Sequence, residues 1–267
     1  MCKVLKINRS SYYKRRSRGK GKRYIENQSL LKRIREIYEK SHECYGSPRI
    51  TAELRREGIS FNRKRIARIM SKNGIAAKIF RRYRITTNSM HKNQRAENIL
   101  RQEFNRSRSN EVWTSDITYI RTEEGWLYLA AVLDIYSRKV VGWQLDKRLD
   151  TDLVERALRN ALMDRKVDRG IIFHSDQGIQ YTTESFRKLL VENGFVQSMS
   201  RKGNCYDNAI TESFFHTLKT ELVKRTRYKT REEARRSIFE YIEIFYNRKR
   251  LHSSLGYCTP VEFEILT

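Results

Sequence analysis

The spacing of apolar residues changes near residue 110, and this change constrains the fold more than any other feature of the chain. Before it, apolar side chains recur every three or four residues, as in helices. After it, the segments "EVWTSDITYIRT", "GWLYLAAVLDIYS" and "KVVGWQLD" are rich in β-branched and aromatic residues and indicate strands. The connections "EEG" and "SR" are short, so we expect these three strands to form an antiparallel meander.

Helices and strands alternate in the sequence that follows the meander. The segments "TDLVERALRNALMDRK" and "TTESFRKLLVENG" have helical spacing, whereas "GIIFHSD" and "VQSMS" have the length and composition of short strands. Together with the meander they predict an α/β domain with a mixed five-stranded sheet and helices packed on its faces.

The first part of the chain predicts three helices. The first covers about residues 29–40; the second has Ser47 as N-cap and Pro48 as its first helical residue, and ends near Gly58. The third helix follows Asn62 as N-cap and ends before Gly74. Two helices joined by a tight turn are typical of a helix-turn-helix.

The third helix carries basic residues on the faces that its apolar stripe leaves free. A helix that lies against DNA phosphates needs such residues, which here are Arg63, Lys64, Arg65, Arg68 and Lys72. A helical hairpin with a solvated basic face has the same pattern, so the motif alone leaves both interpretations open.

The distribution of charge favours a polyanion as partner. The chain has 56 Lys and Arg and 31 Asp and Glu, a net charge of +25, and residues 1–110 hold 31 of the basic and 8 of the acidic residues. A basic region beside a nearly neutral one is typical of a nucleic-acid-binding module joined to a globular domain. Ribosomal and membrane-surface proteins share this pattern.

Four regions are expected from these patterns. Residues 1–77 form a basic helix-turn-helix region, residues 78–108 a basic linker, residues 109–225 an α/β core, and residues 226–267 a C-terminal helix and tail.

The cysteines and the apolar segments indicate a cytoplasmic protein. The four cysteines are scattered without a C-x-x-C pair, so neither a disulfide framework nor a zinc cluster is expected. The beginning of the chain does not resemble a signal peptide, and the longest apolar run, "WLYLAAVL", is shorter than the ~20 residues that cross a membrane.

Three carboxylates stand at positions where a site could form. Asp116 lies inside the first strand, Asp176 ends the strand "IIFHSD", and Glu212 lies in the helical stretch "GNCYDNAITESFFHTLKTEL". Each alone has an ordinary explanation as a strand-edge, turn or surface residue. Together they could gather around hard cations, because oxygen ligands without His or Cys favour Mg²⁺ or Mn²⁺. Two such ions would suit phosphoryl transfer.

The segments around these acids resemble a known family. "WTSDITYI", "FHSDQGIQY" and "GNCYDNAITESFFHTLKTE", with 35 residues between Asp176 and Glu212, are similar to the motifs of DDE transposases and retroviral-type integrases. The segments "YGSPRITAELRREG" and "YNRKRLHSSLGYCTPVEF" extend the likeness over almost the whole chain. The chain resembles in particular the OrfB products of bacterial insertion sequences.

This resemblance implies an RNase H-like fold and Mg²⁺-dependent cleavage and strand transfer of DNA. It implies that Asp116, Asp176 and Glu212 are catalytic metal ligands and that Lys219, two helical turns after Glu212, contacts DNA. It also implies a homo-oligomer on insertion-sequence ends and target DNA, and a possible upstream-frame partner, OrfA, or a fusion with it. A catalytically silent repressor and a structural RNA-binding protein are the competing hypotheses.

Other polar residues in these motifs have simpler expected roles. His174 is either packed or catalytic, Asp207 or Asn208 is expected to cap the helix that carries Glu212, and Asp134 is expected to have a structural role. Basic residues of the tail could contact DNA or a second subunit, and the sequence does not separate these alternatives: Arg248, Lys249, Arg250 and His252.

Overall fold

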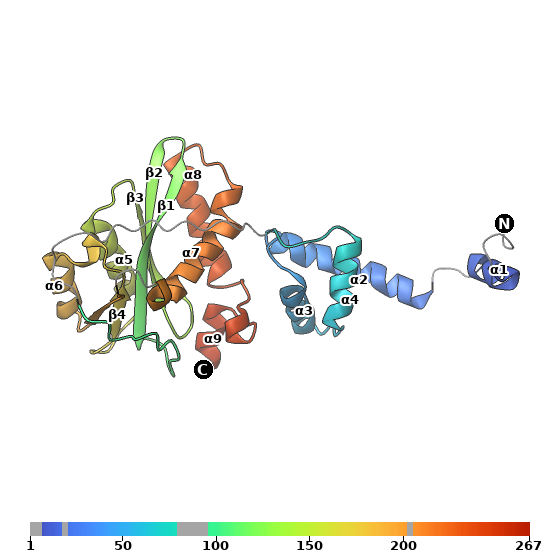
Figure 1. Cartoon of the computed structure of the whole chain (residues 1–267), viewed down its shortest axis with the longest axis horizontal. Helices are drawn as coiled ribbons and strands as arrows, with labels where there is room; N and C mark the ends of the chain where they lie inside the picture. The colour runs from blue at the N-terminus through green and yellow to red at the C-terminus, as the bar shows by residue number, and fades with distance from the viewer. Residues whose placement is uncertain (1–6, 18–20, 79–95, 202–204) are drawn as a thin grey trace. The chain divides into compact units, whose positions relative to one another are not determined.

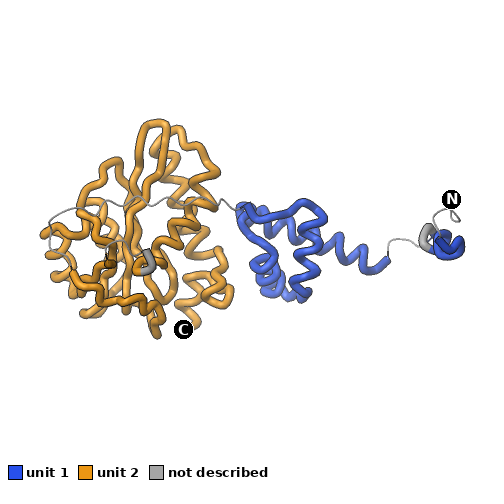
Figure 2. The backbone as a smooth tube through the Cα atoms, viewed as in Figure 1, with its two compact units in different colours: residues 1–78 blue, residues 79–267 orange. Residues whose placement is uncertain are grey.

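The computed structural model describes residues 7–17, 21–78, 96–201 and 205–267. The chain divides into two compact units, residues 1–78 and 79–267, which are coloured separately in Figure 2. Most of the expected linker 78–108 lies outside the described residues, which resume at Ala96. The expected core 109–225 and tail 226–267 lie within one unit.

The first unit is helical. It contains α1 (Arg9–Ser17), α2 (Lys22–Lys40), α3 (Ser47–Arg56) and α4 (Arg63–Lys72). The last three pack through apolar side chains that are shielded from solvent, among them Ile34, Ile50, Leu54 and Ile66. Because each helix buries one face, its apolar residues recur every three or four positions, and this spacing allowed the helices to be predicted from the sequence.

Two helix starts in this unit differ in how well they were predicted. Asn62 caps α4 as predicted, because its side chain accepts a hydrogen bond from the amide of Lys64 at 2.8 Å. The prediction of Ser47 as N-cap of α3 is wrong. The carbonyl of Gly46 already accepts the first helical hydrogen bond, from Ile50 at 3.1 Å, so Ser47 is the first helical residue and Pro48 the second.

The second unit is built on the predicted mixed five-stranded sheet. Its strands are β1 (Val112–Thr122), β2 (Gly125–Asp134), β3 (Val140–Asp146), β4 (Ile172–Ser175) and β5 (Val196–Met199). The order across the sheet is β3-β2-β1-β4-β5. The meander β1-β2-β3 is antiparallel, whereas β4 and β5 run parallel to β1. The predicted fold class is confirmed.

Helices cover both faces of this sheet, as Figure 1 shows. On one face, α5 (Thr151–Asp164) and α6 (Glu184–Glu192) pack in a core with Trp113 and Phe173. The approach of α5 requires Gly142, where a Cβ would lie 2.4 Å from the carbonyl oxygen of Ala157. The other face is covered by α7 (Ala209–Glu221). The helix α8 (Arg231–Phe239) lies on the same side of the β1–β2 hairpin as α7.

The C-terminal segment packs against α7 and the sheet. A π-helix (Glu240–Tyr246) continues α8, and α9 (Pro260–Leu266) ends the chain. The remaining short elements are 3₁₀ turns at Ile179–Tyr181, Cys205–Asn208, Val223–Arg225 and Ser253–Leu255.

A buried ion pair joins this segment to the end of α7. Arg250 donates two hydrogen bonds to Glu221, at 2.8 and 2.7 Å, and the hydroxyl of Tyr241 donates a third at 2.7 Å. The side chains of Arg250 and Glu221 are only 5% and 8% exposed. The expectation that Arg250 contacts DNA or a second subunit is therefore wrong, because its guanidinium is enclosed within its own chain.

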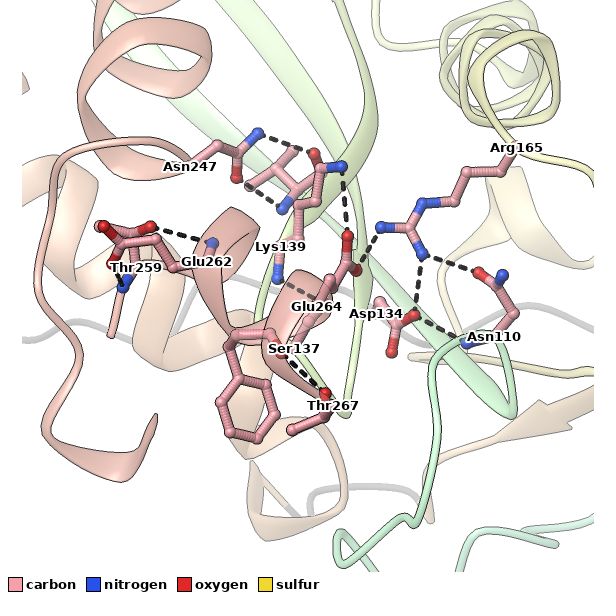
Figure 3. Close-up of polar contacts among 12 residues, drawn as sticks. Asn110, Asp134, Ser137, Lys139, Arg165, Asn247, Thr259, Glu262, Glu264 and Thr267 are labelled. Atoms are coloured by element: carbon pink, nitrogen blue, oxygen red, sulfur yellow. Dashed lines mark hydrogen bonds and ion pairs between the residues drawn. The ribbon is translucent and has the colours of Figure 1, made fainter. Parts of the chain in front are cut away.

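Asp134 has the structural role that was expected. Its carboxylate accepts a hydrogen bond from the amide of Asn110 at 2.8 Å and pairs with Arg165 at 3.2 Å (Figure 3). It also accepts a hydrogen bond from the amide of Tyr136 at 2.9 Å. Arg165 also pairs with Glu264 of α9. One network thus joins the start of β1, the end of β2 and the C-terminal helix.

Among the residues that the structure describes, no helix has both the length and the apolar composition to cross a membrane.

Candidate active site

Asp116 lies where β1 extends past the end of a neighbouring strand. β1 pairs with β4 at Val112–Ser115, and the last pair is Ser115 with Ser175. Asp116 follows this pair and lies opposite Ala131 of β2. Its Oδ1 accepts a hydrogen bond from the amide of Ile117 at 2.7 Å.

Asp176 follows the last residue of β4 and is therefore brought beside Asp116 by the strand register. Its Oδ1 accepts a hydrogen bond from the amide of Gly178 at 2.9 Å. A Cβ on residue 178 would also lie 2.9 Å from this oxygen, so glycine allows the close turn that holds the carboxylate.

Glu212 reaches the same end of the sheet from α7. The preceding residue, Thr211, donates a hydrogen bond to Thr114 of β1 at 2.7 Å, and both threonines are fully buried. Because Thr114 and Asp116 lie on the same face of β1, this contact holds α7 over the face that carries Asp116. The start of α7 is thus fixed one residue from Glu212.

The electrostatics show that the three carboxylates act on one another. Burial raises the pKa of Asp116 well above its usual value, and the charges of Asp176 and Glu212 raise it further. Burial also raises the pKa of Glu212, with a second contribution from Asp176. The three carboxylates thus concentrate negative charge at one place, which marks a candidate functional site.

This donor set fits a hard divalent cation. Carboxylate oxygens are the ligands that Mg²⁺ and Mn²⁺ prefer, and a cation would relieve the repulsion that raises the pKa of Asp116. Across the described parts of the chain, no three His, Cys, Asp or Glu side chains already form a compact set that would enclose a metal ion. The three acids interact electrostatically, but their side chains do not by themselves surround a metal-sized space.

Lys219 lies on α7 and contributes a positive charge to this region. Its side chain is partly buried. Burial lowers the pKa of Lys219, whereas the charge of Asp116 opposes that shift. The same interaction lowers the pKa of Asp116, so the two side chains are within electrostatic reach of each other.

Asp207 does not cap α7. Its carboxylate accepts hydrogen bonds from Asn98 and Gln102, each at 2.8 Å, and from the amide of Arg201 at 2.9 Å. Asn208 occupies the N-cap position without a side-chain cap bond. The capping prediction is wrong because the carboxylate is used by segments distant in sequence. Burial by itself raises the pKa of Asp207, but the hydrogen bonds from Arg201 and Gln102 outweigh it and lower the pKa.

His174 is a packed residue. It is fully buried, and its Nδ1 forms a hydrogen bond with Ser198 at 2.9 Å. Burial lowers the pKa of His174 to about 4. The imidazole is therefore neutral at physiological pH, which favours the packed alternative over a catalytic one.

The basic residues of α4 have two different environments. Arg63, Lys64, Arg68 and Lys72 are exposed. Arg65 is partly buried: its guanidinium donates hydrogen bonds to Asn27 at 2.9 and 2.8 Å and to Glu26 at 3.0 Å. It also lies over the ring of Phe61, 4.6 Å from the centroid. Arg65 therefore holds α4 against α2, whereas the other four side chains face solvent.

Comparison with known proteins shows which class of protein has this combination of a helical unit and an α/β unit. A model described as an HTH-like domain matches residues 25–83, and two models described as an integrase core domain match residues 106–205 and 212–267. A chain in the cryo-EM structure of the simian T-cell lymphotropic virus intasome with PP2A regulatory subunit B56 gamma superposes with a TM-score of 0.50. It is 14% identical, covers 86% of this chain and 74% of that chain, and shows likeness of fold alone. The protein is an integrase-core protein with a helix-turn-helix-like domain.

Full-length relatives define the family more narrowly. The transposase InsF of insertion sequence IS3A from Escherichia coli K12 is 41% identical over 99% of this chain and 92% of its own length. An insertion element IS600 protein of 31 kDa from Shigella sonnei is 41% identical over 98% of this chain and 97% of its own length. The chain belongs to the IS3 family of insertion-sequence transposases.

Proposed function

We propose that this transposase cleaves DNA at the ends of its insertion sequence and joins the freed 3′ ends to target DNA. The observation that carries the proposal is the convergence of three acids, Asp116 from β1, Asp176 from the end of β4 and Glu212 from α7. The reaction has two phosphoryl transfers. Water attacks the phosphorus at the element end, the P–O3′ bond breaks, and the leaving 3′ oxygen takes up a proton. That 3′ hydroxyl then loses its proton and attacks a phosphodiester of the target, so that a new O3′–P bond forms, the P–O3′ bond of the target strand breaks, and the released 3′ oxygen of the target takes up a proton.

The three acids would hold Mg²⁺, for which Mn²⁺ is a chemical substitute. When bound, a pair of such ions supplies activation of the attacking oxygen and stabilisation of the leaving oxygen. The chain itself contributes position: Asp116 and Asp176 are fixed by hydrogen bonds from Ile117 and Gly178. Lys219 would contact a phosphate of the terminal DNA, since its ammonium lies within electrostatic reach of Asp116.

The helical unit would bind the DNA that the core cuts. The exposed side chains of Arg63, Lys64, Arg68 and Lys72 would contact phosphates, and Arg65 would support them by holding α4 in place. The protein would act as a homo-oligomer on two element ends, alone or together with an upstream-frame protein or as a fusion with it. Its place of action would be the bacterial cytoplasm, where the DNA is.

Cleavage of an element-end duplex tests the assignment of the acids. The substrate is the DNA that flanks the coding sequence, and the product is followed with and without Mg²⁺. We expect Asp116→Asn, Asp176→Asn and Glu212→Gln each to abolish cleavage while binding remains. The matched control is Asp168→Asn, a change of the same kind at an exposed aspartate, which should cleave like the original protein. Cleavage at the original rate in the three variants would refute the proposal, and binding without any cleavage by the unchanged protein would indicate a repressor.

Metal binding has a readout that does not depend on activity. In the absence of metal, Asp116→Asn should be more stable than the original protein, because it removes a buried charge that Asp176 and Glu212 repel. At a hundredfold excess over its Kd, Mg²⁺ should stabilise the original protein by about 2.7 kcal/mol and Asp116→Asn much less. Equal stabilisation of both proteins in thermal unfolding would place the ion elsewhere.

A further inference from the structure

Three aromatic side chains form an exposed cluster on the β1–β2 hairpin. Tyr119 lies directly opposite Tyr128 in the strand register, with ring centroids 5.3 Å apart and an interplanar angle of 74°. Trp126 stands at 6.3 Å and 86° from Tyr119. These three residues, here called the aromatic platform, share one face of the sheet, because the cross-strand pairs Tyr119–Tyr128 and Arg121–Trp126 alternate with pairs on the other face.

The platform is rigid on one side and open on the other. Tyr128 packs against the main core below α5 and α6, whereas Trp126 is 49% exposed and Tyr119 36% exposed. Edge-to-face contacts hold the rings in fixed orientations. An exposed group of large aromatic rings is costly to leave in water and commonly marks a contact surface.

The platform lies close to two of the three acids. Tyr119 is three residues from Asp116 on the same strand, a distance of roughly 10 Å between Cα atoms, and this odd spacing turns the two side chains to opposite faces of β1. Both residues belong to the part of β1 beyond its pairing with β4. Burial and Tyr128 raise the pKa of Tyr119, and the charges of Asp116 and Asp176 add to the shift. The ring is therefore within electrostatic reach of two of the acids.

The charges around the platform suit a polyanion. Arg121 is exposed and lies opposite Trp126 in the register. Arg231 donates a hydrogen bond to the carbonyl of Trp126 at 3.1 Å. Of the two glutamates of the hairpin turn, Glu123 pairs with Arg227 at 2.8 Å, whereas the carboxylate of Glu124 accepts a hydrogen bond from the backbone amide of Arg231 at 2.8 Å. Aromatic faces between cationic side chains are the usual surface for single-stranded nucleic acid.

We propose that the aromatic platform binds an unpaired nucleobase of the DNA strand beside the phosphodiester held at Asp116, while Arg121 contacts a neighbouring phosphate. The inference rests on the proposed function for the position of that phosphodiester. Paired bases have their faces covered by their neighbours, so the ligand is a base that has left the duplex. Unpairing costs least at a frayed or broken end, which is what cleavage creates.

Fluorescence of 2-aminopurine tests base binding directly. The probe replaces single nucleotides on either side of the cleavage position in the flanking-DNA duplex, and binding is measured with the cleavage-deficient Asp116→Asn protein. We expect a fluorescence change at one or two positions, which Trp126→Ala in the same background removes and Trp126→Phe largely keeps. The control is Met163→Ala, which truncates a side chain that is 83% exposed and belongs to α5. No change at any position would overturn the proposal.

Kinetics separate this inference from the assignment of the acids. In the otherwise unchanged protein, Trp126→Ala should slow cleavage about 5- to 150-fold, the range expected for one base stacked on an aromatic ring. A substrate already mismatched at the responsive position should recover part of this loss. If Asp116→Asn is inactive but Trp126→Ala cleaves normally, the platform proposal fails and the acids stand. If Trp126→Ala changes only the oligomeric mass in solution, the platform is a contact between copies of the chain and the proposal is wrong.

Discussion

The buried pair between Arg250 and Glu221 gives the most quantitative prediction. Replacing Arg250 with Met keeps most of the side-chain volume and removes the positive charge. Glu221 then remains buried at the end of α7 with only the hydroxyl of Tyr241 as a hydrogen-bond donor among the three contacts of this network. Removing one partner of a buried ion pair costs about 3–5 kcal/mol, because the other charge stays in a medium that does not solvate it.

Two further variants divide this cost. Tyr241→Phe removes one hydrogen bond to a charged acceptor and should cost about 1.5–3 kcal/mol. The double variant Arg250→Met with Glu221→Leu removes both charges and should be more stable than Arg250→Met alone, since the buried carboxylate has gone. The matched control is Arg248→Met, at an exposed arginine two residues away, which should change stability by less than about 0.5 kcal/mol.

These free energies of unfolding are measured by urea titration with tryptophan fluorescence as the signal, which reports on residues 79–267. Trp113, Trp126 and Trp143 are the three tryptophans of the chain, and all belong to residues 79–267. Two results would refute the reasoning: a loss below about 1 kcal/mol in Arg250→Met, or a double variant as unstable as the single one. The first would mean that Glu221 reaches water, and the second that shape rather than charge determines the cost.

Two further predictions concern pH and salt. Because the pKa of His174 is about 4 when folded and 6.5 in its ordinary state, the unfolded chain binds the extra proton first, so stability should fall between pH 6.5 and 4 by up to about 3 kcal/mol. Unfolding of His174→Asn at several pH values should show a smaller fall, and His216→Asn, at an exposed histidine, should behave like the original protein. In DNA binding, Arg68→Ala with Lys72→Ala should reduce the slope of log K against log salt by about 1.8 if both side chains contact phosphates. An equal reduction in the exposed-site control Lys166→Ala would contradict an assignment to α4.

The sheet, and the elements that carry the three acids, were predictable because their signals are local. Each strand of the meander is marked by its own β-branched and aromatic residues, and the connections "EEG" and "SR" leave little choice of pairing. The acids stand in motifs whose residues are adjacent in sequence. Asp134 ends β2, and one of its contacts, the amide of Tyr136, lies only two residues further along the chain, so a structural role could be predicted locally.

Apart from the N-cap of α3, the errors concern side chains whose partners are distant in sequence. Arg250 lies in the basic run "RKR", yet its guanidinium is buried because it pairs with Glu221, which lies 29 residues earlier in the chain. Arg65 belongs to a helix that is basic on several faces, and only its contacts with Glu26 and Asn27 distinguish it from its neighbours. Charge type alone could not separate these residues, because a buried arginine and a DNA-contacting arginine have the same local sequence.

The hydrogen bonds of Asp207 also decide where a separately produced catalytic fragment has to begin. Asn98 and Gln102, its partners 109 and 105 residues earlier in the chain, precede β1, and Leu100 between them is fully buried. A fragment that starts at residue 109 would lose both amide donors, expose Ile210 beside the missing Leu100, and leave the carboxylate with Arg201 as its remaining partner in this network. Production of the core alone should therefore start at or before Ala96.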